Sequence, residues 1–154
     1  MGIEAGQKAP TVALADQNGK KVKLADFKGQ RIVVYFFPKA DTPGCTAQSC
    51  AMRDADADLK KLNAVVIGVS PDSPEKQKKF DEKYGLAFTL LSDPDHTMAE
   101  AFGVWAEKSM YGRKYMGVVR SAFVIDEKGT VAAAFSKISP GDTVPKVSQA
   151  LKDL

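Results

Sequence analysis

The sequence predicts an α/β protein with a mixed central sheet, helices on both of its faces and a β-hairpin near the N-terminus. Two apolar runs, residues 32–37 and 64–70, are continuous rather than alternating, which is typical of strands covered on both faces. Each run is followed by a stretch of helix-forming residues. With 154 residues the chain can bury one sizeable core, so we expect a single domain over residues 1–154.

Shorter runs rich in β-branched or aromatic residues complete the predicted sheet. The Asn18-Gly19 step favours a tight turn between the first two of these runs, and residues 126–129 join the last two. Residues 113–117 are polar and flanked by glycine, so we expect a loop there. The predicted short strands are residues 11–14, 21–24, 88–91, 118–125 and 131–135.

Capping and composition mark the predicted helices. The stretch from Cys45 to Lys61 contains neither proline nor glycine, so a helix is expected to begin at or near Cys45. Ser73 is suited to an N-cap, Pro74 to the first helical position and Gly85 to the stop of a second helix. The predicted helices are residues 45–61, 74–84, 96–102 and 143–151.

Composition narrows the possible functions. The 22 basic residues are interleaved with 19 acidic ones for a net charge of +3, and no basic run with aromatic residues indicates nucleic-acid binding. No apolar run approaches the roughly 18 residues that span a membrane, and the N-terminus lacks the pattern of a secretory signal. We therefore expect a cytoplasmic protein. We also expect a monomer, although nothing in the composition bears on the oligomeric state. In a reducing compartment, its two cysteines are better suited to catalysis or metal binding than to structural cross-linking.

The stretch around Cys45 carries most of the chemical information. Pro38 ends the strand at residues 32–37, two prolines and a glycine exclude regular structure up to Gly44, and the helix then begins. Amides in the first turn of a helix have no internal partners, and the helix dipole adds partial positive charge there. A thiolate is stabilised in such a position, so Cys45 is a candidate nucleophile. The alternative is a buried, inert thiol after a turn.

The pattern Pro38-x-x-x-Thr42-x-x-Cys45 resembles the active-site motif of the peroxiredoxins. The four-residue gap to Cys50 is similar to that of the Q-type, or bacterioferritin comigratory protein, subfamily. The resemblance covers most of the chain. Other segments that are similar to this family are Arg53-Asp54 and residues 88–93, 102–105 and 120–126.

This resemblance implies a thioredoxin-like fold and a thiol peroxidase that reduces hydrogen peroxide and organic hydroperoxides. Cys45 would be the peroxidatic cysteine, and its sulfenic acid would condense with Cys50 to an intramolecular disulfide that thioredoxin reduces. Thr42 and Arg120 would donate hydrogen bonds to the reacting oxygens, and Pro38 would shield the sulfenic acid. No metal, haem or flavin cofactor is implied.

Each of these residues also has a simpler interpretation. Arg120 is expected within an apolar strand, where burying an unpaired charge is costly, so it either reaches a cleft or lies on an edge strand facing water. Cys50 could be a small core residue, although a second thiol five positions after a nucleophile is a natural resolving partner. A metal site is poorly supported, because His96 is the only histidine. Asp41 would oppose a thiolate, so we expect its carboxylate to point away.

Two other functional classes remain open. A disulfide reductase on the same fold is disfavoured by the absence of a Cys-x-x-Cys pair. A non-catalytic redox sensor or chaperone-like module could use the same cysteines as a switch. In a regular helix, Cys45 and Cys50 would have Cα atoms roughly 8.6 Å apart on different faces, whereas disulfides need less than about 7 Å. We therefore expect oxidation to unwind the segment between them.

Overall fold

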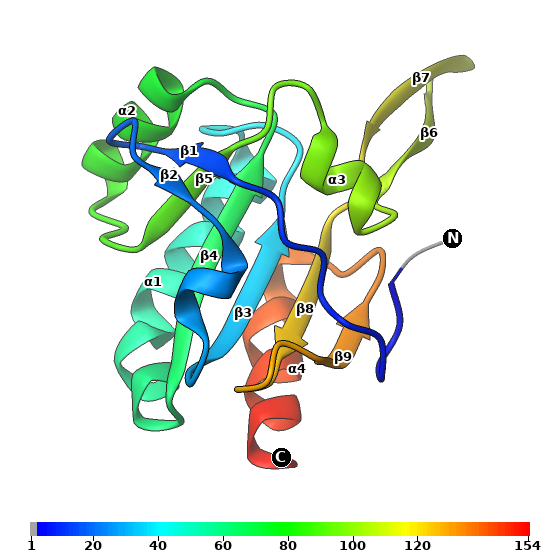
Figure 1. The fold of residues 1–154 in the computed structure, drawn as a ribbon. Coiled ribbons are helices and arrows are strands. Elements are labelled where there is room, and N and C mark those ends of the chain that lie inside the picture. The colour runs from blue at the N-terminus through cyan, green and yellow to red at the C-terminus, as the bar shows by residue number, and fades with distance from the viewer. Residues whose placement is uncertain (1–2) are drawn as a thin grey trace.

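The computed structural model describes residues 3–154 and contains a seven-stranded mixed sheet with the order β2-β1-β5-β4-β3-β8-β9 (Figure 1). A separate two-stranded sheet is formed by β6 and β7. The strands are β1 (Leu14–Asp16), β2 (Lys21–Val22), β3 (Arg31–Phe36), β4 (Ala64–Ser70), β5 (Thr89–Ser92), β6 (Trp105–Met110), β7 (Arg113–Val118), β8 (Ser121–Ile125) and β9 (Val131–Phe135). The helices are η1 (Leu24–Phe27), α1 (Pro43–Lys61), α2 (Pro74–Tyr84), α3 (Thr97–Ala101), η2 (Pro140–Asp142) and α4 (Thr143–Lys152).

The centre of the sheet is parallel and its edges are antiparallel. Strand β3 pairs in parallel with β4, and β4 with β5, while β8 runs antiparallel to β3 and β1 antiparallel to β5. The α/β class and the mixed sheet are therefore confirmed. The N-terminal hairpin also forms, with β1 and β2 antiparallel around the predicted turn.

Strand β3 shows why the continuous apolar runs are buried on both faces. Ile32, Val34 and Phe36 belong to the core cluster that packs against α3. Val33 and Tyr35 point to the opposite face, into the cluster formed with α1, α2 and α4. All five residues are almost fully buried. Side chains alternate along a strand, so a strand between two layers must be apolar throughout.

Most element boundaries agree with prediction within about two residues, but the start of the chain differs. The first strand is residues 14–16 rather than 11–14, and the second ends at Val22 instead of Leu24. Leu24 begins the short helix η1. The Asp26 side chain accepts a hydrogen bond from the Lys23 backbone N–H at 3.1 Å, which stabilises a helical start over a continued strand.

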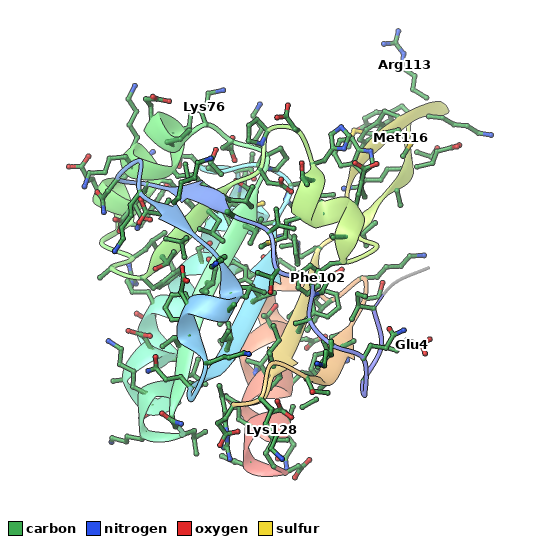
Figure 2. All side chains as sticks on the ribbon, viewed as in Figure 1. Glu4, Lys76, Phe102, Arg113, Met116 and Lys128 are labelled. Atoms are coloured by element: carbon green, nitrogen blue, oxygen red, sulfur yellow. The ribbon has the colours of Figure 1, made fainter. Side chains whose placement is uncertain are left out.

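The prediction of a loop at residues 113–117 is wrong. Strands β6 and β7 form a regular antiparallel hairpin whose two turn residues, Tyr111 and Gly112, both have positive φ. That geometry is typical of a type I′ turn, in which Asn-Gly is the usual signal and Tyr-Gly is not. Figure 2 shows Arg113 and Met116 on this hairpin, which projects from the body of the molecule.

The predicted strand over residues 118–125 is also wrong at its start. Val118 is the last residue of β7, Val119 and Arg120 form a link, and β8 begins at Ser121. Arg120 therefore does not lie within a strand. Its position in a link frees the backbone from the sheet ladder and lets the chain change direction between the two sheets.

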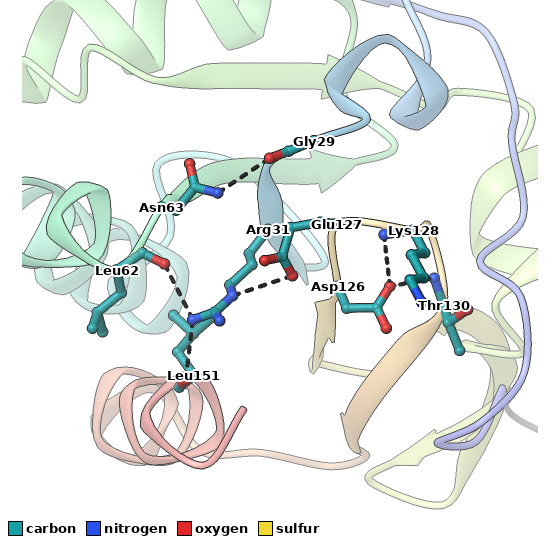
Figure 3. A network of polar contacts seen from close by, with 9 residues as sticks. All are labelled: Gly29, Arg31, Leu62, Asn63, Asp126, Glu127, Lys128, Thr130 and Leu151. Atoms are coloured by element: carbon teal, nitrogen blue, oxygen red, sulfur yellow. Dashed lines mark hydrogen bonds and ion pairs between the residues drawn. The ribbon is translucent and has the colours of Figure 1, made fainter.

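Arg31, the first residue of β3, connects the sheet to the ends of two helices (Figure 3). One guanidinium nitrogen donates to the carbonyl oxygens of Leu62 at 3.4 Å and Leu151 at 3.3 Å, near the C-terminal ends of α1 and α4. The Nε atom contacts Glu127 at 3.4 Å. A cation suits the negative end of a helix dipole, so Arg31 anchors the C-terminal end of α1. Within residues 3–154, no helix is both long and apolar enough to cross a bilayer.

Candidate active site

Cys45 is the third residue of α1 and its side chain is fully buried. Thr42 is the N-cap and Pro43 the first helical residue, because proline fits a position whose amide needs no partner. The first backbone bond of the helix runs from the Thr46 N–H to the Thr42 carbonyl at 2.8 Å. The amides of Gly44 and Cys45 precede that bond, so they and the helix dipole can stabilise negative charge near the sulfur.

Arg120, 75 positions after Cys45 in the chain, places a positive charge beside the Cys45 sulfur. Its Nη2 atom lies 3.5 Å from Cys45 Sγ, and its Nη1 atom donates to Gln48 Oε1 at 2.7 Å. Its own carbonyl accepts a bond from the Ile138 N–H at 3.0 Å, which holds the link in place. The half-buried guanidinium is therefore directed at the thiol, and the alternative of an arginine facing water is wrong.

Gln48 was not among the residues expected in the site. Its side chain is fully buried. Its Nε2 atom donates a hydrogen bond to Thr143 Oγ1 at 3.1 Å, and its Oε1 atom accepts the hydrogen bond from Arg120 Nη1. The Thr143 hydroxyl in turn donates to the Ser139 carbonyl at 3.0 Å. Gln48 lies three positions after Cys45 and thus on the same helix face, which is the sequence signal that could have indicated it.

Gly44 allows Arg120 to come this close. A Cβ atom at position 44 would lie 3.1 Å from Arg120 Nη2, which is closer than an ordinary contact. Glycine is required here for a close approach of a side chain rather than for a positive φ.

Thr42 and Pro38 border the loop that leads into α1. The Thr42 hydroxyl donates to the Lys39 carbonyl at 2.7 Å, and the half-buried Pro38 lies two residues after the end of β3. The Thr42 hydroxyl proton is thus used within the loop, while its oxygen lone pairs remain available. Roles for Thr42 and Pro38 toward a bound peroxide stay predictions.

Asp41 points away from Cys45, as expected. Its carboxylate contacts Lys83 Nζ at 2.9 Å and accepts a bond from the Tyr84 hydroxyl at 2.7 Å, both on α2. These bonds, from Lys83 first and Tyr84 second, lower the pKa of the Asp41 carboxyl below its usual value. The negative charge is therefore neutralised at the surface and does not oppose a thiolate in the site.

Cys50 is a half-buried free thiol in the same helix, and Cys45 is free as well. Because α1 is regular from Pro43 to Lys61, ideal helix geometry separates the two Cα atoms by roughly 8.6 Å. That separation exceeds the roughly 7 Å limit for a disulfide. The helix as observed holds the two thiols apart.

Lys108 is a second cation near the site that the sequence did not indicate, because it belongs to the unpredicted hairpin. Its Nζ atom donates to the Val118 carbonyl at 2.9 Å. Burial lowers the pKa of Lys108, the charge of Arg120 adds to the lowering, and Cys45 acts in the opposite direction. Lys108 is therefore close enough to Arg120 and Cys45 for their charges to act on its ammonium group. Among residues 3–154, no cluster of His, Cys, Asp or Glu has the composition to hold a metal ion.

Comparison with known proteins agrees with this arrangement. Residues 5–134 match the model of the AhpC/TSA family. The chain is 49% identical over 154 residues to Peroxiredoxin Bcp of Bacillus subtilis, with 100% of this chain and 98% of that protein covered. It is 52% identical over 133 residues to Peroxiredoxin Bcp of Escherichia coli K12, with 86% and 85% covered.

Solved structures show the same fold. Peroxiredoxin Q of Xanthomonas campestris superposes with a TM-score of 0.90 at 34% identity, covering 98% of each chain. Peroxidoxin BcpB of Mycobacterium tuberculosis superposes with a TM-score of 0.88 at 32% identity, covering 99% of this chain and 98% of the other. The fold is thus thioredoxin-like, as the resemblance implied. The chain belongs to the AhpC/TSA family and is a peroxidase of the Bcp and Q type of peroxiredoxin.

Proposed function

We propose that this peroxidase reduces hydrogen peroxide and small organic hydroperoxides with Cys45 as the peroxidatic cysteine, Cys50 as the resolving cysteine and thioredoxin as the reductant. The observation that carries the proposal is the contact of Arg120 Nη2 with the buried Cys45 Sγ, at 3.5 Å, in the first turn of α1. A related protein supports the substrate class. The bacterioferritin comigratory protein of Xanthomonas campestris, 34% identical with a TM-score of 0.90, was solved in a study of its alkyl peroxide reduction.

In the first step the Cys45 thiolate attacks one peroxide oxygen and the O–O bond breaks. The sulfur becomes a sulfenic acid, and the departing oxygen takes a proton and leaves as water or an alcohol. Negative charge grows on that oxygen in the transition state, so fixed donors aimed at it lower the barrier. Arg120 and the amides of Gly44 and Cys45 are the donors at hand. The Thr42 hydroxyl would join them only after its proton leaves the Lys39 carbonyl, to which it now donates at 2.7 Å.

In the second step the Cys50 thiol attacks the sulfur of the sulfenic acid, and water leaves as the disulfide forms. Residues 45–50 must unwind for this step, because a regular helix keeps the two Cα atoms too far apart. The two electrons needed to restore the thiols come from the dithiol of thioredoxin. The wound segment would react with peroxide, and the unwound segment would expose the disulfide to its reductant.

Replacement of each cysteine tests the two roles. Cys45→Ser should abolish peroxide consumption, because no nucleophile remains. Cys50→Ser should keep one turnover and lose cycling with thioredoxin. The readout is NADPH oxidation in a thioredoxin-coupled assay, together with a single-turnover measurement of peroxide loss. Normal first-turnover activity in Cys45→Ser would overturn the assignment.

Two substitutions of Arg120 test its positive charge and the geometry of its guanidinium group separately. Arg120→Ala should reduce the single-turnover rate about a hundredfold or more, as the loss of an oxyanion donor does. Arg120→Lys should restore only part of that rate, since an ammonium group cannot contact both Gln48 and the sulfur as the guanidinium does. A rate for Arg120→Ala within about threefold of the wild type would remove Arg120 from the mechanism.

The second candidate function is a redox sensor that uses the same cysteine pair as a switch, which the two free thiols in one helix also permit. The coupled assay separates the two possibilities. A sensor would oxidise once and stop, whereas the proposed enzyme consumes many equivalents of peroxide for each protein chain.

A further inference from the structure

A buried hydrogen bond lies beneath the segment that separates the two cysteines. Tyr35 Oη in β3 and Ser49 Oγ in α1 are 2.8 Å apart, and both side chains are fully buried. Ser49 directly precedes Cys50 and lies within residues 45–50. We propose that Tyr35 and Ser49 form a latch that holds this segment wound and thereby sets the rate at which the oxidised Cys45 reaches Cys50. This inference rests on the proposed function, in which Cys45 and Cys50 form a disulfide.

Tyr35 cannot follow Ser49 when the segment unwinds. Its ring stacks on Phe37 with centroids 5.5 Å apart and meets the edge of Phe88 at 6.1 Å. It also crosses Gly68, its partner residue in β4, where a Cβ atom would lie 2.9 Å from both Cζ and Oη of Tyr35. The central strands therefore hold the hydroxyl at one place, and Ser49 is the partner that the helix supplies.

Unwinding breaks this bond and leaves the Tyr35 hydroxyl in the core without Ser49. Burial raises the pKa of Tyr35 far above its usual value, so the phenol keeps its proton and still needs an acceptor. A buried polar group without a partner is unfavourable enough to shift an opening equilibrium by about one to two orders of magnitude. Arg31 holds the other end of α1, so the opening stays local to the first turns.

The latch has a chemical consequence because the sulfenic acid on Cys45 has two fates. It can condense with the Cys50 thiol, releasing water, or it can react with a second peroxide molecule. In the second reaction the sulfur gains another oxygen and becomes a sulfinic acid, and the peroxide leaves as water or an alcohol. A latch that slows unwinding lengthens the life of the sulfenic acid. Tyr35 and Ser49 therefore raise the fraction of chains lost to sulfinic acid at high peroxide concentrations.

Ser49→Ala is a sharp test because two effects on the helix have opposite signs. Alanine is the better helix former, so helix propensity alone would slow unwinding. Loss of the latch would accelerate it. We expect disulfide formation after a single peroxide addition to become about tenfold faster. The sulfinic acid yield at a fixed peroxide excess, measured by mass spectrometry, should fall by a similar factor, while the first-step rate stays within about twofold of the wild type.

Thr46→Ala is the matched control, since Thr46 lies in the same segment and has no side-chain bond to Tyr35. It changes helix propensity alone and should leave disulfide formation unchanged or slightly slower. Adding Tyr35→Phe to Ser49→Ala should give no further acceleration, because one bond cannot be lost twice. Amide exchange of residues 46–50 in the reduced protein should rise in Ser49→Ala and not in Thr46→Ala.

The outcomes separate this inference from the proposed function. If the wild type forms no Cys45–Cys50 disulfide by peptide mass spectrometry, the proposed function fails. If the disulfide forms but Ser49→Ala condenses at the wild-type rate or more slowly, the latch is refuted and the proposed function stands. A Ser49→Ala protein that loses amide protection throughout the sheet would also refute the latch, because the bond would then support the whole fold.

Discussion

Replacing Gly44 with alanine tests how closely Arg120 must approach the sulfur. The added Cβ atom would lie 3.1 Å from Arg120 Nη2 and 3.7 Å from Pro140 Cγ. Ordinary contacts between heavy atoms lie at about 3.5–4.0 Å, so the guanidinium must move by roughly 0.5 Å. Its Nη1 atom is held by Gln48 at 2.7 Å, so the displacement falls mainly on Nη2, the atom that contacts Cys45.

The expected effect on the rate follows from this displacement. A misplacement of about 1 Å can cost a hundredfold in rate, so about half of that distance corresponds to roughly tenfold. Tenfold equals about 1.4 kcal/mol of transition-state stabilisation. Stability should change little, because Gly44 is the second residue of α1, where the advantage of alanine over glycine, about 1 kcal/mol in a helix interior, applies only in part. Gly44→Ala should thus be slower in peroxide reduction and about as stable as the wild type.

The assay is a single-turnover measurement of Cys45 oxidation, with thermal unfolding measured on the same samples. Gly141→Ala is the matched control, because a Cβ atom there meets no heavy atom within 4 Å and Gly141 lies in η2, next to Pro140. The control should react at the wild-type rate. If Gly44→Ala also reacts within twofold of the wild type, the close approach of Arg120 to the sulfur does not control the rate.

Three further predictions concern the surroundings of the site. Gln48→Leu removes the acceptor that holds Arg120, so single-turnover oxidation should slow about tenfold; an unchanged rate would show that Arg120 is positioned without Gln48. Asp41→Asn should reduce the loss of folding stability in acid. The pKa of Asp41 in the folded state is lowered, chiefly by Lys83. The contribution of Asp41 to folding stability is therefore complete above the unfolded-state pKa of about 3.9 and is lost as the pH falls through the folded-state pKa. Urea unfolding between pH 2 and pH 6 checks this, and parallel curves for both proteins would contradict it. Tyr111→Asn should stabilise the β6–β7 turn by a few tenths of a kcal/mol, because asparagine tolerates the φ of 52° better than tyrosine does; faster amide exchange in the hairpin would oppose this expectation.

The sequence alone predicts those elements whose signals are local. Strand β4 and helix α2 agree with prediction residue for residue. The signal for β4 is a continuous apolar run, and the signals for α2 are the capping residues Ser73, Pro74 and Gly85. Each of these signals depends only on residues close in sequence. The start of α1 is predicted within two residues for the same reason. Cys45 as a candidate nucleophile follows from this position, and the peroxiredoxin family follows from the motif around it.

Contacts between distant segments were decided only by the tertiary structure. The link that carries Arg120 was predicted as strand because apolar composition does not show where one sheet ends and another begins. The approach of Arg120 to Cys45 spans 75 positions in the chain, and its support by Gln48 spans 72. The Tyr35 hydroxyl meets Ser49 only because β3 lies beneath α1. Periodicity and capping report the conformation of neighbouring residues, whereas these pairings depend on how sheet and helices pack, and that packing brings the reactive sulfur, its cation and the candidate latch together.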